Sequence, residues 1–420
     1  MSPVTLPPTP QPCCPEFAAV SRRGLFSGAL ALAGATTIIG SAAVTTSAAA
    51  LTPASSALVV LSLRGAADGM SLVVPHADPV YYSARPRIAV PPDQLLAKDA
   101  MFGLHPQLEP LLPMWQSGRL AAVQATGLPA PNRSHFAAME EVEDADPGST
   151  VRSGWLNRLI GTDGSTSPLQ GFAMGGGVVP TSLYGAQPVM SAADVSSMQI
   201  PGDDEWDTTR GRRASLHTLW DADRSPMGTA MRSLFGVLDD FGPVVDAADH
   251  SSSYPETDLG RALAEAARVI RGDVGVEVIT VDQGDWDMHS GMGTAQDGWM
   301  SNNARDLATA IATFFADLGD LASKVTLVTL SEFGRRVVEN ASNGLDHGYG
   351  NVMFVAGAGV KGGTYYGSWP GLTEDDDADL LVTTDYRSVL SEIVSTRFGA
   401  STASVFPGFS PESVGVMTSV

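Results

Sequence analysis

Short apolar runs of strand length alternate with amphipathic helical patterns along most of this chain, and this alternation most restricts how it can fold. Several runs are rich in β-branched residues and stop abruptly at a glycine or charged residue, as buried strands do. They cover residues 57–63, 120–125, 276–281, 325–330 and 352–356. Strands that alternate with helices predict an α/β domain in which helices flank a central, mostly parallel sheet.

The helical patterns lie between these strands, with apolar residues repeating every three or four positions. They cover residues 108–115, 259–270, 307–321 and 385–397. We expect the strand at 57–63, the helix at 108–115 and the strand at 120–125 to form one βαβ unit.

Residues 150–256 are the least regular part of the chain. A glycine-rich stretch at 171–177 and several proline and aspartate turns interrupt any longer pattern. We therefore predict a loop-rich insertion within a single domain that spans 51–420. The acidic run at 374–379 is expected to be a solvated loop.

The first fifty residues have the pattern of an export signal. Arg22 and Arg23 precede an apolar run of small residues that contains no Lys or Arg before Arg64, and the alanines at 48–50 suit cleavage. A retained transmembrane anchor is the alternative, although Gly, Ala, Ser and Thr dilute the run. We predict a twin-arginine signal peptide at 1–50 that engages the twin-arginine export machinery. The protein would then be secreted, periplasmic or on the cell surface, with no stable membrane span after cleavage.

Charge and cysteine content argue against a nucleic-acid partner and against sites that depend on cysteine. The formal net charge is -21, which disfavours binding to nucleic acid. Cys13 and Cys14 are the two cysteines of the chain, and both lie in the predicted signal peptide. The remaining chain therefore has neither a disulfide nor a thiolate-bound metal.

Polar side chains follow the predicted strands at the point where each strand ends. Because the carboxyl ends of parallel strands meet at one edge of a sheet, we expect these side chains to converge there. Carboxylates and imidazoles without cysteine suit one or two divalent cations, with Zn, Mn, Ca and Mg all open. The candidate metal ligands are Asp68, Asp287, His289, Glu332, Asp346 and His347.

Ser134 lies where a proline-rich turn leads into a helix predicted over 137–143. Backbone N–H groups and the macrodipole at a helix N-terminus favour an anion. The alternative is that Asn132 or Ser134 is only the N-cap. His135 beside Ser134 suggests a serine esterase, but successive helical residues point about 100° apart. Since the chain also has no Gly-x-Ser-x-Gly motif, a serine esterase is disfavoured.

Four other histidines receive no role in the predicted site. His76, His217 and His250 fall in segments expected to be loops, without nearby partners. His105 precedes Pro106 and is expected to begin a helix.

Five motifs occur in order along the chain. They are Asp-Gly-Met at 68–70, Asn-Arg-Ser-His-Phe at 132–136, Asp-Trp-Asp-x-His at 285–289, Ser-Glu-Phe-Gly-Arg at 331–335 and Asp-His-Gly at 346–348. Together they resemble the motifs of exported bacterial proteins known as the domain of unknown function 1501 family, over nearly all of 51–420. That family is grouped with the alkaline phosphatases and sulfatases. The resemblance therefore implies an alkaline phosphatase-like fold with a site for one or two metal ions.

The resemblance also implies roles for single residues. Asp68 matches the first metal-binding aspartate of the superfamily, and Ser134 matches its nucleophile at a helix N-terminus. Asp287 and His289 resemble the ligands that follow the next core strand, and His347 resembles a late histidine ligand.

Two departures from the superfamily pattern narrow the chemistry. Glu332 stands where an Asp-His or Asp-Asn pair is usual, so that Phe333 fills the position of a ligand. A single ion, or a site with altered chemistry, is therefore the sharper expectation. The sequence after Ser134 lacks the Cys/Ser-x-Pro-x-Arg context of sulfatases that use formylglycine, so that activity is not expected.

The leading hypothesis is an exported, metal-dependent hydrolase of phosphate or sulfate esters, acting on a small-molecule or polymer substrate. Ser134 would attack, and Arg133 or Arg335 would hold the non-bridging oxygens. For each arginine the alternative is a surface position or a carboxylate partner. The alternative function is a non-catalytic secreted or cell-surface binding protein that retains the fold and a structural ion.

Overall fold

The computed structural model describes residues 36–39, 42–45, 53–165, 167–175, 178–200, 202–203 and 207–418. The predicted signal peptide lies outside these residues except for two short strands, β1 (Thr36–Ile39) and β2 (Ala42–Thr45), which pair antiparallel. The signal peptide therefore stays a prediction.

A mixed sheet of eleven strands forms the centre of the domain, in the order β1-β2-β8-β7-β9-β3-β10-β11-β6-β12, with β13 beside β6. The strands after β2 are β3 (Ala57–Leu63), β6 (Leu120–Gly127), β7 (Gly171–Met174), β8 (Met190–Ala192), β9 (Val278–Gln283), β10 (Val325–Leu330), β11 (Asn351–Gly357), β12 (Tyr365–Tyr366) and β13 (Thr384–Asp385). Strands β8, β7, β9, β3 and β10 are successive parallel neighbours, whereas β11 is antiparallel to β10 and β6. The sheet is thus mostly parallel, which confirms the predicted α/β class. A second, two-stranded sheet pairs β4 (Val73–Val74) with β5 (Gly103–Leu104).

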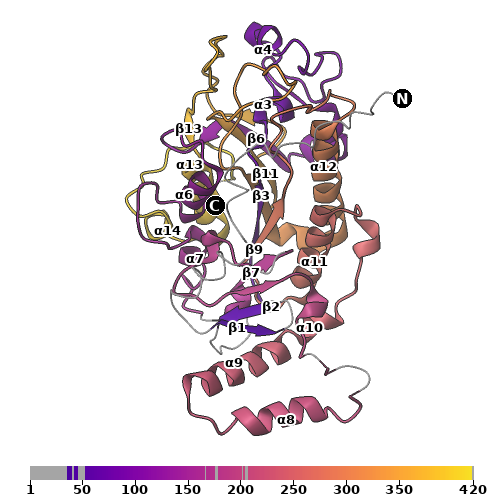
Figure 1. The fold of residues 1–420 in the computed structure, drawn as a ribbon, viewed down its shortest axis with the longest axis vertical. Coiled ribbons are helices and arrows are strands. Elements are labelled where there is room, and N and C mark those ends of the chain that lie inside the picture. The colour runs from indigo at the N-terminus through magenta and orange to yellow at the C-terminus, as the bar shows by residue number, and fades with distance from the viewer. Residues whose placement is uncertain are drawn as a thin grey trace, which may run out of the picture. The chain divides into compact units, whose positions relative to one another are not determined.

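Helices cover both faces of the main sheet, with α11 and α12 on one side and α6, α7, α13 and α14 on the other (Figure 1). The α-helices are α3 (Gly69–Leu72), α4 (Pro79–Ala84), α5 (Leu112–Gln116), α6 (His135–Asp144), α7 (Trp155–Leu159), α8 (Gly211–Trp220), α9 (Pro226–Asp240), α10 (Gly242–Asp246), α11 (Asp258–Gly272), α12 (Trp299–Leu318), α13 (Tyr386–Phe398) and α14 (Thr402–Val405). The 3₁₀ helices are η2 (Pro106–Leu111), η3 (Pro168–Gln170), η4 (Thr181–Leu183), η5 (Val195–Ser197), η6 (Ser251–Ser253) and η7 (Gly319–Lys324).

Strand β3 shows why the central strands are continuous apolar runs. All of its residues are buried. Val59 and Leu61 belong to the core that includes α11 and α12, whereas Leu58 and Val60 belong to the core beneath α6 and α13. A strand covered on both faces needs apolar side chains at every position, so the pattern that marked it in the sequence has a direct physical cause.

The predicted βαβ unit is only partly right. Strands β3 and β6 run in the same direction, because β3 is parallel to β10 and β11 is antiparallel to both β10 and β6. They are not neighbours, however, since β10 and β11 lie between them. Two strands from the C-terminal part of the chain insert there, and adjacency in sequence does not determine adjacency in the sheet.

Residues 150–256 are more regular than their sequence suggests. They contribute β7 and β8, which extend the parallel part of the sheet beyond β9. They also form the ten-residue helix α8 and the fifteen-residue helix α9, and no residue of α8 is buried. The glycines and prolines of this segment separate short elements rather than preventing them.

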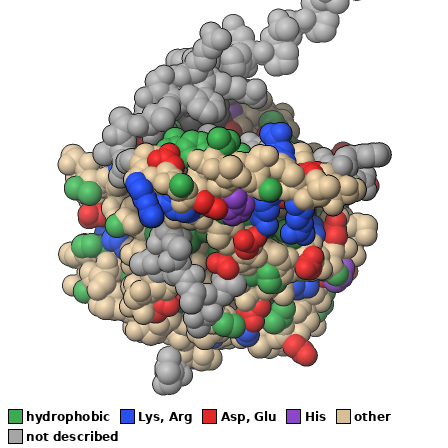
Figure 2. All heavy atoms as spheres, turned by 90° about the horizontal axis from the view of Figure 1, so that it is seen from below, with side chains coloured by type: hydrophobic (Ala, Val, Ile, Leu, Met, Phe, Trp, Pro, Cys, Tyr) green, Lys and Arg blue, Asp and Glu red, His purple; other side chains and the backbone are tan. Residues whose placement is uncertain are grey.

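The described surface mixes charged and apolar groups. On the face in Figure 2, basic, acidic and hydrophobic side chains are interspersed, without one large patch of a single kind. Within the described ranges, none of the helices combines the length and hydropathy that a membrane span requires.

Candidate metal centre

Loops at one edge of the main sheet position the candidate site. Strands β9, β3 and β10 are parallel neighbours, so the loops that follow them, at 284–289, 64–68 and 331–335, leave the same edge. Strand β6 runs in the same direction and leads to α6, and the segment before the antiparallel β11 returns to this edge. Residues far apart in the sequence can therefore meet here.

Three side chains lie close enough together to hold a metal ion. His135, Asp287 and His347 each offer a ligand atom, and these atoms lie within 4.8 Å of one another. The Nε2 atom of His347 is 3.0 Å from Nε2 of His135 and 2.9 Å from Nε2 of His289. Asp287 Oδ1 is 3.1 Å from His289 Nε2 and 3.7 Å from His135 Nε2. The Nε2 atoms of three histidines thus surround one carboxylate oxygen.

The opposite ring nitrogen of each histidine meets an acceptor that fixes the orientation of the ring. The Nδ1 contacts are His135 to Glu332 Oε1 (2.7 Å), His289 to Asp346 Oδ1 (2.9 Å) and His347 to the carbonyl oxygen of Arg133 (2.9 Å). Ionised carboxylates and carbonyls only accept, so each Nδ1 donates, and Nε2 of a neutral ring presents its lone pair to the centre. Carboxylates and carbonyls behind the rings orient metal-binding histidines in this way.

Hydrogen bonding can satisfy only one of the two Nε2 contacts that His347 makes. An unprotonated Nε2 has one lone pair, so His347 cannot accept well from both His135 and His289. A cation shared by the three lone pairs satisfies all of them. Ligand nitrogens about 2.0–2.1 Å from a tetrahedral Zn²⁺ are about 3.3 Å apart, close to the 2.9 and 3.0 Å separations here.

The electrostatics of the centre favour added positive charge. Burial lowers the pKa of His135, but hydrogen bonds and charges from Asp287 and Glu332 outweigh it and raise the pKa to about 9. The hydrogen bond to Asp287 is the main cause that raises the pKa of His289. Burial raises the pKa of Asp287, yet hydrogen bonds from the histidines and Arg335 hold it well below its usual range. Protons on the histidines can supply the charge, and a metal ion would displace them.

Arg335 and Gly65 hold Asp287 in place. The Arg335 guanidinium is 1% exposed and donates to Asp287 Oδ1 at 2.7 Å. Its other donors reach main-chain carbonyls, including those of Ala66 (2.7 Å) and Leu345 (3.0 Å). Gly65 has a φ of +106°, and a Cβ there would lie 2.6 Å from the main-chain nitrogen of Asp287, so only glycine fits. Arg335, expected to hold substrate oxygens, instead pairs with the carboxylate of Asp287.

Asp68 is not part of the cluster. Its Oδ2 and Oδ1 accept from the Arg85 guanidinium at 2.6 and 3.1 Å. Asp68 is 4% exposed and Arg85 is fully buried. Both carboxylate oxygens of Asp68 are thus engaged by an internal cation, and Asp68 does not belong to the group of described side chains that could share a metal ion.

Ser134 occupies the N-cap position of α6, directly before His135. Its hydroxyl makes no capping hydrogen bond, and its main-chain N–H donates instead to Asn132 Oδ1 at 3.1 Å. Asn132 therefore organises the turn that leads into α6. Arg133, also expected to hold substrate, is 41% exposed and pairs with Asp379.

The structure brings together most of the candidate residues, but in two different layers. Asp287, His289 and His347 face the centre, while Glu332 and Asp346 lie behind histidine rings instead of facing it. His135 was not among the candidate metal ligands, although it belongs to the group that could hold an ion. The strand-end rule that selected Ser134 applies equally to its neighbour, and that signal could have found it.

The outlying histidines differ from expectation in part. His105 caps η2, where its Nδ1 accepts from Gln107 N–H at 3.1 Å, which confirms its predicted place at the beginning of a helix. His217 and His250, expected to lack partners, pair with Asp221 and Asp317.

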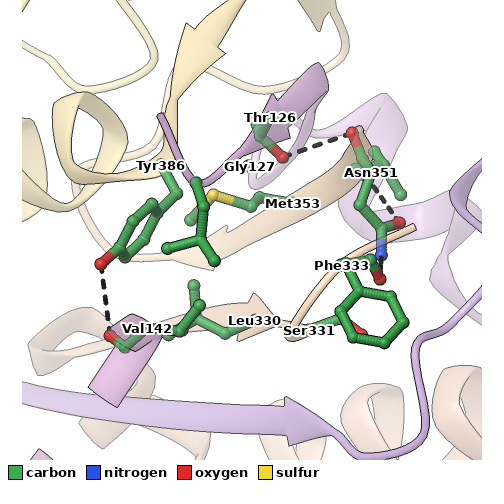
Figure 3. A pocket seen from close by; sticks show the side chains of 11 residues that line it. Thr126, Gly127, Val142, Leu330, Ser331, Phe333, Asn351, Met353 and Tyr386 are labelled. Carbon is green, nitrogen blue, oxygen red and sulfur yellow. Dashed lines mark hydrogen bonds between the residues drawn. The ribbon is translucent and has the colours of Figure 1, made fainter. Parts of the chain in front are cut away.

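Phe333 gives the centre an apolar wall. Its ring centroid lies 4.9 Å from that of His135 and 5.0 Å from that of His347. Beside it, Figure 3 shows Leu330 and Met353 lining a small cavity. The volume of that cavity is about 10 Å³, room for about one water molecule and no substrate.

A larger cavity of about 460 Å³ borders the histidines on another side. His289 and His347 line it together with Arg133, Arg336 and Asp377. A volume of a few hundred cubic ångströms is typical of small-molecule sites. This cavity is the candidate substrate site.

Comparison with known proteins identifies a family but no activity. The model of a family described as a protein of unknown function (DUF1501) matches residues 108–390. No curated protein matches the chain. The matched region contains every residue whose Nε2 or carboxylate faces the centre.

Proposed function

The chain belongs to the DUF1501 family, whose description assigns no activity, and we propose that it is a metal-dependent hydrolase of phosphate or sulfate esters. The observation that carries the proposal is the convergence of three histidine Nε2 atoms on Asp287 Oδ1. Each ring is oriented by the hydrogen bond of its Nδ1, so the centre is preorganised for a cation. An alkaline phosphatase-like fold is part of this proposal.

The ligand atoms favour a single zinc ion. Three imidazoles and one carboxylate suit Zn²⁺, whereas Ca²⁺ and Mg²⁺ prefer shells of oxygen ligands. The resemblance puts Phe333 at the position of a ligand for a second ion, and the Phe333 ring packs against His135 and His347. The proposed centre therefore consists of His135, His289, His347 and Asp287 around one ion.

The residues around the centre suit ester hydrolysis. A bound divalent ion would polarise a phosphoryl or sulfuryl oxygen and lower the pKa of a nearby hydroxyl. Ser134 supplies that hydroxyl at the N-terminus of the ten-residue helix α6, where main-chain N–H groups favour an anion. In the proposed reaction the Ser134 oxygen bonds to the phosphorus or sulfur as the bond to the ester oxygen breaks, and the serine proton passes to that oxygen, which departs as an alcohol. Water would then hydrolyse the seryl ester, which releases phosphate or sulfate and restores the Ser134 hydroxyl.

Metal analysis and turnover of an aryl phosphate and an aryl sulfate test the proposal on the purified full chain. We expect about one equivalent of zinc in the wild type and in His217→Ala, whose exposed histidine lies on α8. His347→Ala should lose the metal and all turnover. Ser134→Ala should keep the metal and lose turnover roughly a thousandfold or more. Metal retained in His347→Ala would exclude the proposed centre.

A non-catalytic protein with a structural ion is the second candidate. The pairing of Asp68 with Arg85 favours it, because the superfamily residue that Asp68 matches binds a metal. Stoichiometric metal without turnover of either ester, in wild type and Ser134→Ala alike, would select this candidate. The proposed localisation outside the cytoplasm applies to both.

A further inference from the structure

Two arginines at the candidate substrate cavity are bound to the chain's own acidic loop, residues 374–379. Arg336 Nη2 lies 2.8 Å from Asp377 Oδ1, and Arg336 Nη1 lies 3.5 Å from Asp379 Oδ1. Arg133 pairs with the other oxygen of Asp379. Arg133, Arg336 and Asp377 all line the cavity, so the loop and the two guanidinium groups meet at its wall.

Both arginines are tied to the histidine centre through the main chain. The carbonyl oxygen of Arg133 accepts the Nδ1 hydrogen bond of His347. Arg336 follows Arg335, and its main-chain N–H donates to the carbonyl oxygen of Asp346 at 3.0 Å. The Arg336 carbonyl accepts from the buried Arg85 at 2.9 Å. The two side chains therefore emerge from backbone that is fixed relative to the metal ligands.

Asp377 holds Arg336 weakly. The Asp377 side chain is 94% exposed, and ion pairs of such groups contribute little because water screens them. Asp379 Oδ1 is buried yet has no hydrogen bond among the described residues. An oxyanion with more acceptor atoms would satisfy the two planar guanidinium groups better than these carboxylates do.

We propose that Arg133 and Arg336 form an oxyanion subsite beside the histidine centre, which Asp377 and Asp379 occupy until a substrate anion displaces them. This proposal rests on the proposed function and narrows its substrate class to phosphate monoesters. A phosphate monoester carries about -1.5 to -2 charge at neutral pH and three acceptor oxygens. A sulfate ester has a single negative charge, as does each aspartate it must displace, so it gains little from the exchange.

The test measures binding of phenylphosphonate and benzenesulfonate to the full chain by calorimetry, at mildly alkaline pH. Neither probe has an ester bond to hydrolyse, and they differ mainly in charge. We expect the phosphonate to bind at least about tenfold more tightly than the sulfonate, and Arg336→Gln to weaken phosphonate binding about tenfold. Asp377→Asn and Asp379→Asn should tighten it about two- to tenfold, because the competing carboxylate is removed.

Asp375→Asn is the matched control, since Asp375 lies in the same loop, is exposed, and makes no ion pair with either arginine. Equal tightening by Asp375→Asn and Asp377→Asn would overturn the proposal in favour of a general charge effect. So would phosphonate binding unchanged in Arg336→Gln, or equal affinity for the two probes.

Metal content measured on the same samples separates this subsite from the metal centre. A chain that lacks bound metal but still binds phosphonate through Arg336 would refute the proposed function and leave the subsite standing. A metal-loaded, active chain with no Arg336-dependent binding would refute the subsite and leave the proposed function standing.

Discussion

Asp68 and Asp287 follow adjacent parallel strands, β3 and β9, yet they have opposite surroundings. Asp68 meets one buried guanidinium, Arg85, which balances its charge and engages both of its oxygens. Asp287 also meets a buried guanidinium, Arg335, but shares its neighbourhood with three histidines and two further carboxylates.

Charge balance explains the difference between the two sites. Asp287, Glu332 and Asp346 together carry three negative charges against the single positive charge of Arg335. The excess is two charges, which is the charge of one divalent ion. The Asp68 pair has no such excess, so a strand-end carboxylate becomes a candidate metal ligand only where internal cations leave it unbalanced.

Breaking the ion pair between Arg85 and Asp68 should have the largest effect on stability. Arg85→Met leaves Asp68 buried without a counter-ion and is expected to lower the free energy of unfolding by about 3–5 kcal/mol. Denaturant unfolding of the full chain measures this loss. The double variant Arg85→Met with Asp68→Leu should recover part of it, and a double variant as unstable as the single one would contradict a charge effect.

Removal of the proposed metal ion should have the second-largest effect on stability. A ligand that binds only the folded chain, at about 100 to 1,000 times its Kd, stabilises it by about 2.7–4.1 kcal/mol. We therefore expect a chelator to lower the melting temperature of the wild type and to leave Asp287→Asn unchanged. Arg85→Met should keep its chelator response, and loss of that response would show that the two regions are coupled.

His105, whose pKa the charge of Asp68 influences, should make the stability of the Asp68 region depend on pH. Burial lowers the pKa of His105 to about 4, so it stays neutral in the folded chain while the unfolded chain takes up a proton near the ordinary value of 6.5. Its contribution to stability is complete above about 6.5 and is lost as the pH falls towards 4. The free energy of unfolding should drop by about 2–3 kcal/mol over this window from His105 alone.

The variant His105→Asn keeps an acceptor for the Gln107 N–H and removes the titrating group. Stability measured against pH for both proteins isolates the contribution of His105, because every other group is shared. Parallel curves between pH 4 and 6.5 would show that His105 is not the cause.

The smallest effect concerns a carboxylate behind a histidine. Glu332→Gln keeps the shape that contacts His135 but weakens its orientation, and is expected to reduce metal affinity about 10- to 100-fold. Competition with a chromogenic chelator measures this change. Affinity lost completely would instead make Glu332 a direct ligand, as the sequence first suggested.

The sequence predicts the fold class well, because burial on both faces leaves a local pattern in strands such as β3 and β10. It does not predict that β10 and β11 separate β3 from β6, since strand order depends on contacts between distant segments. The candidate site is likewise predictable only in part from the sequence. Strand ends locate Asp287, His289 and His347, but no local pattern tells which carboxylate meets an arginine.

Partner choice in the site is a long-range property. His135 and Glu332 are 197 positions apart, and only the packed sheet brings them to 2.7 Å. The expectation for Asp68 failed to anticipate Arg85, seventeen positions later, because helix and loop geometry decides where that guanidinium lies.

The span of the histidine centre has a consequence for how the chain matures. His135 and His347 are 212 positions apart, so the loop between them closes only when β9, β10 and β11 are assembled. A nascent or partly folded chain offers scattered ligands and little affinity. Metal binding would therefore require a fully assembled sheet. Twin-arginine export is predicted to move the chain across a membrane in the folded state, so the metal would bind only to chains that have folded before export.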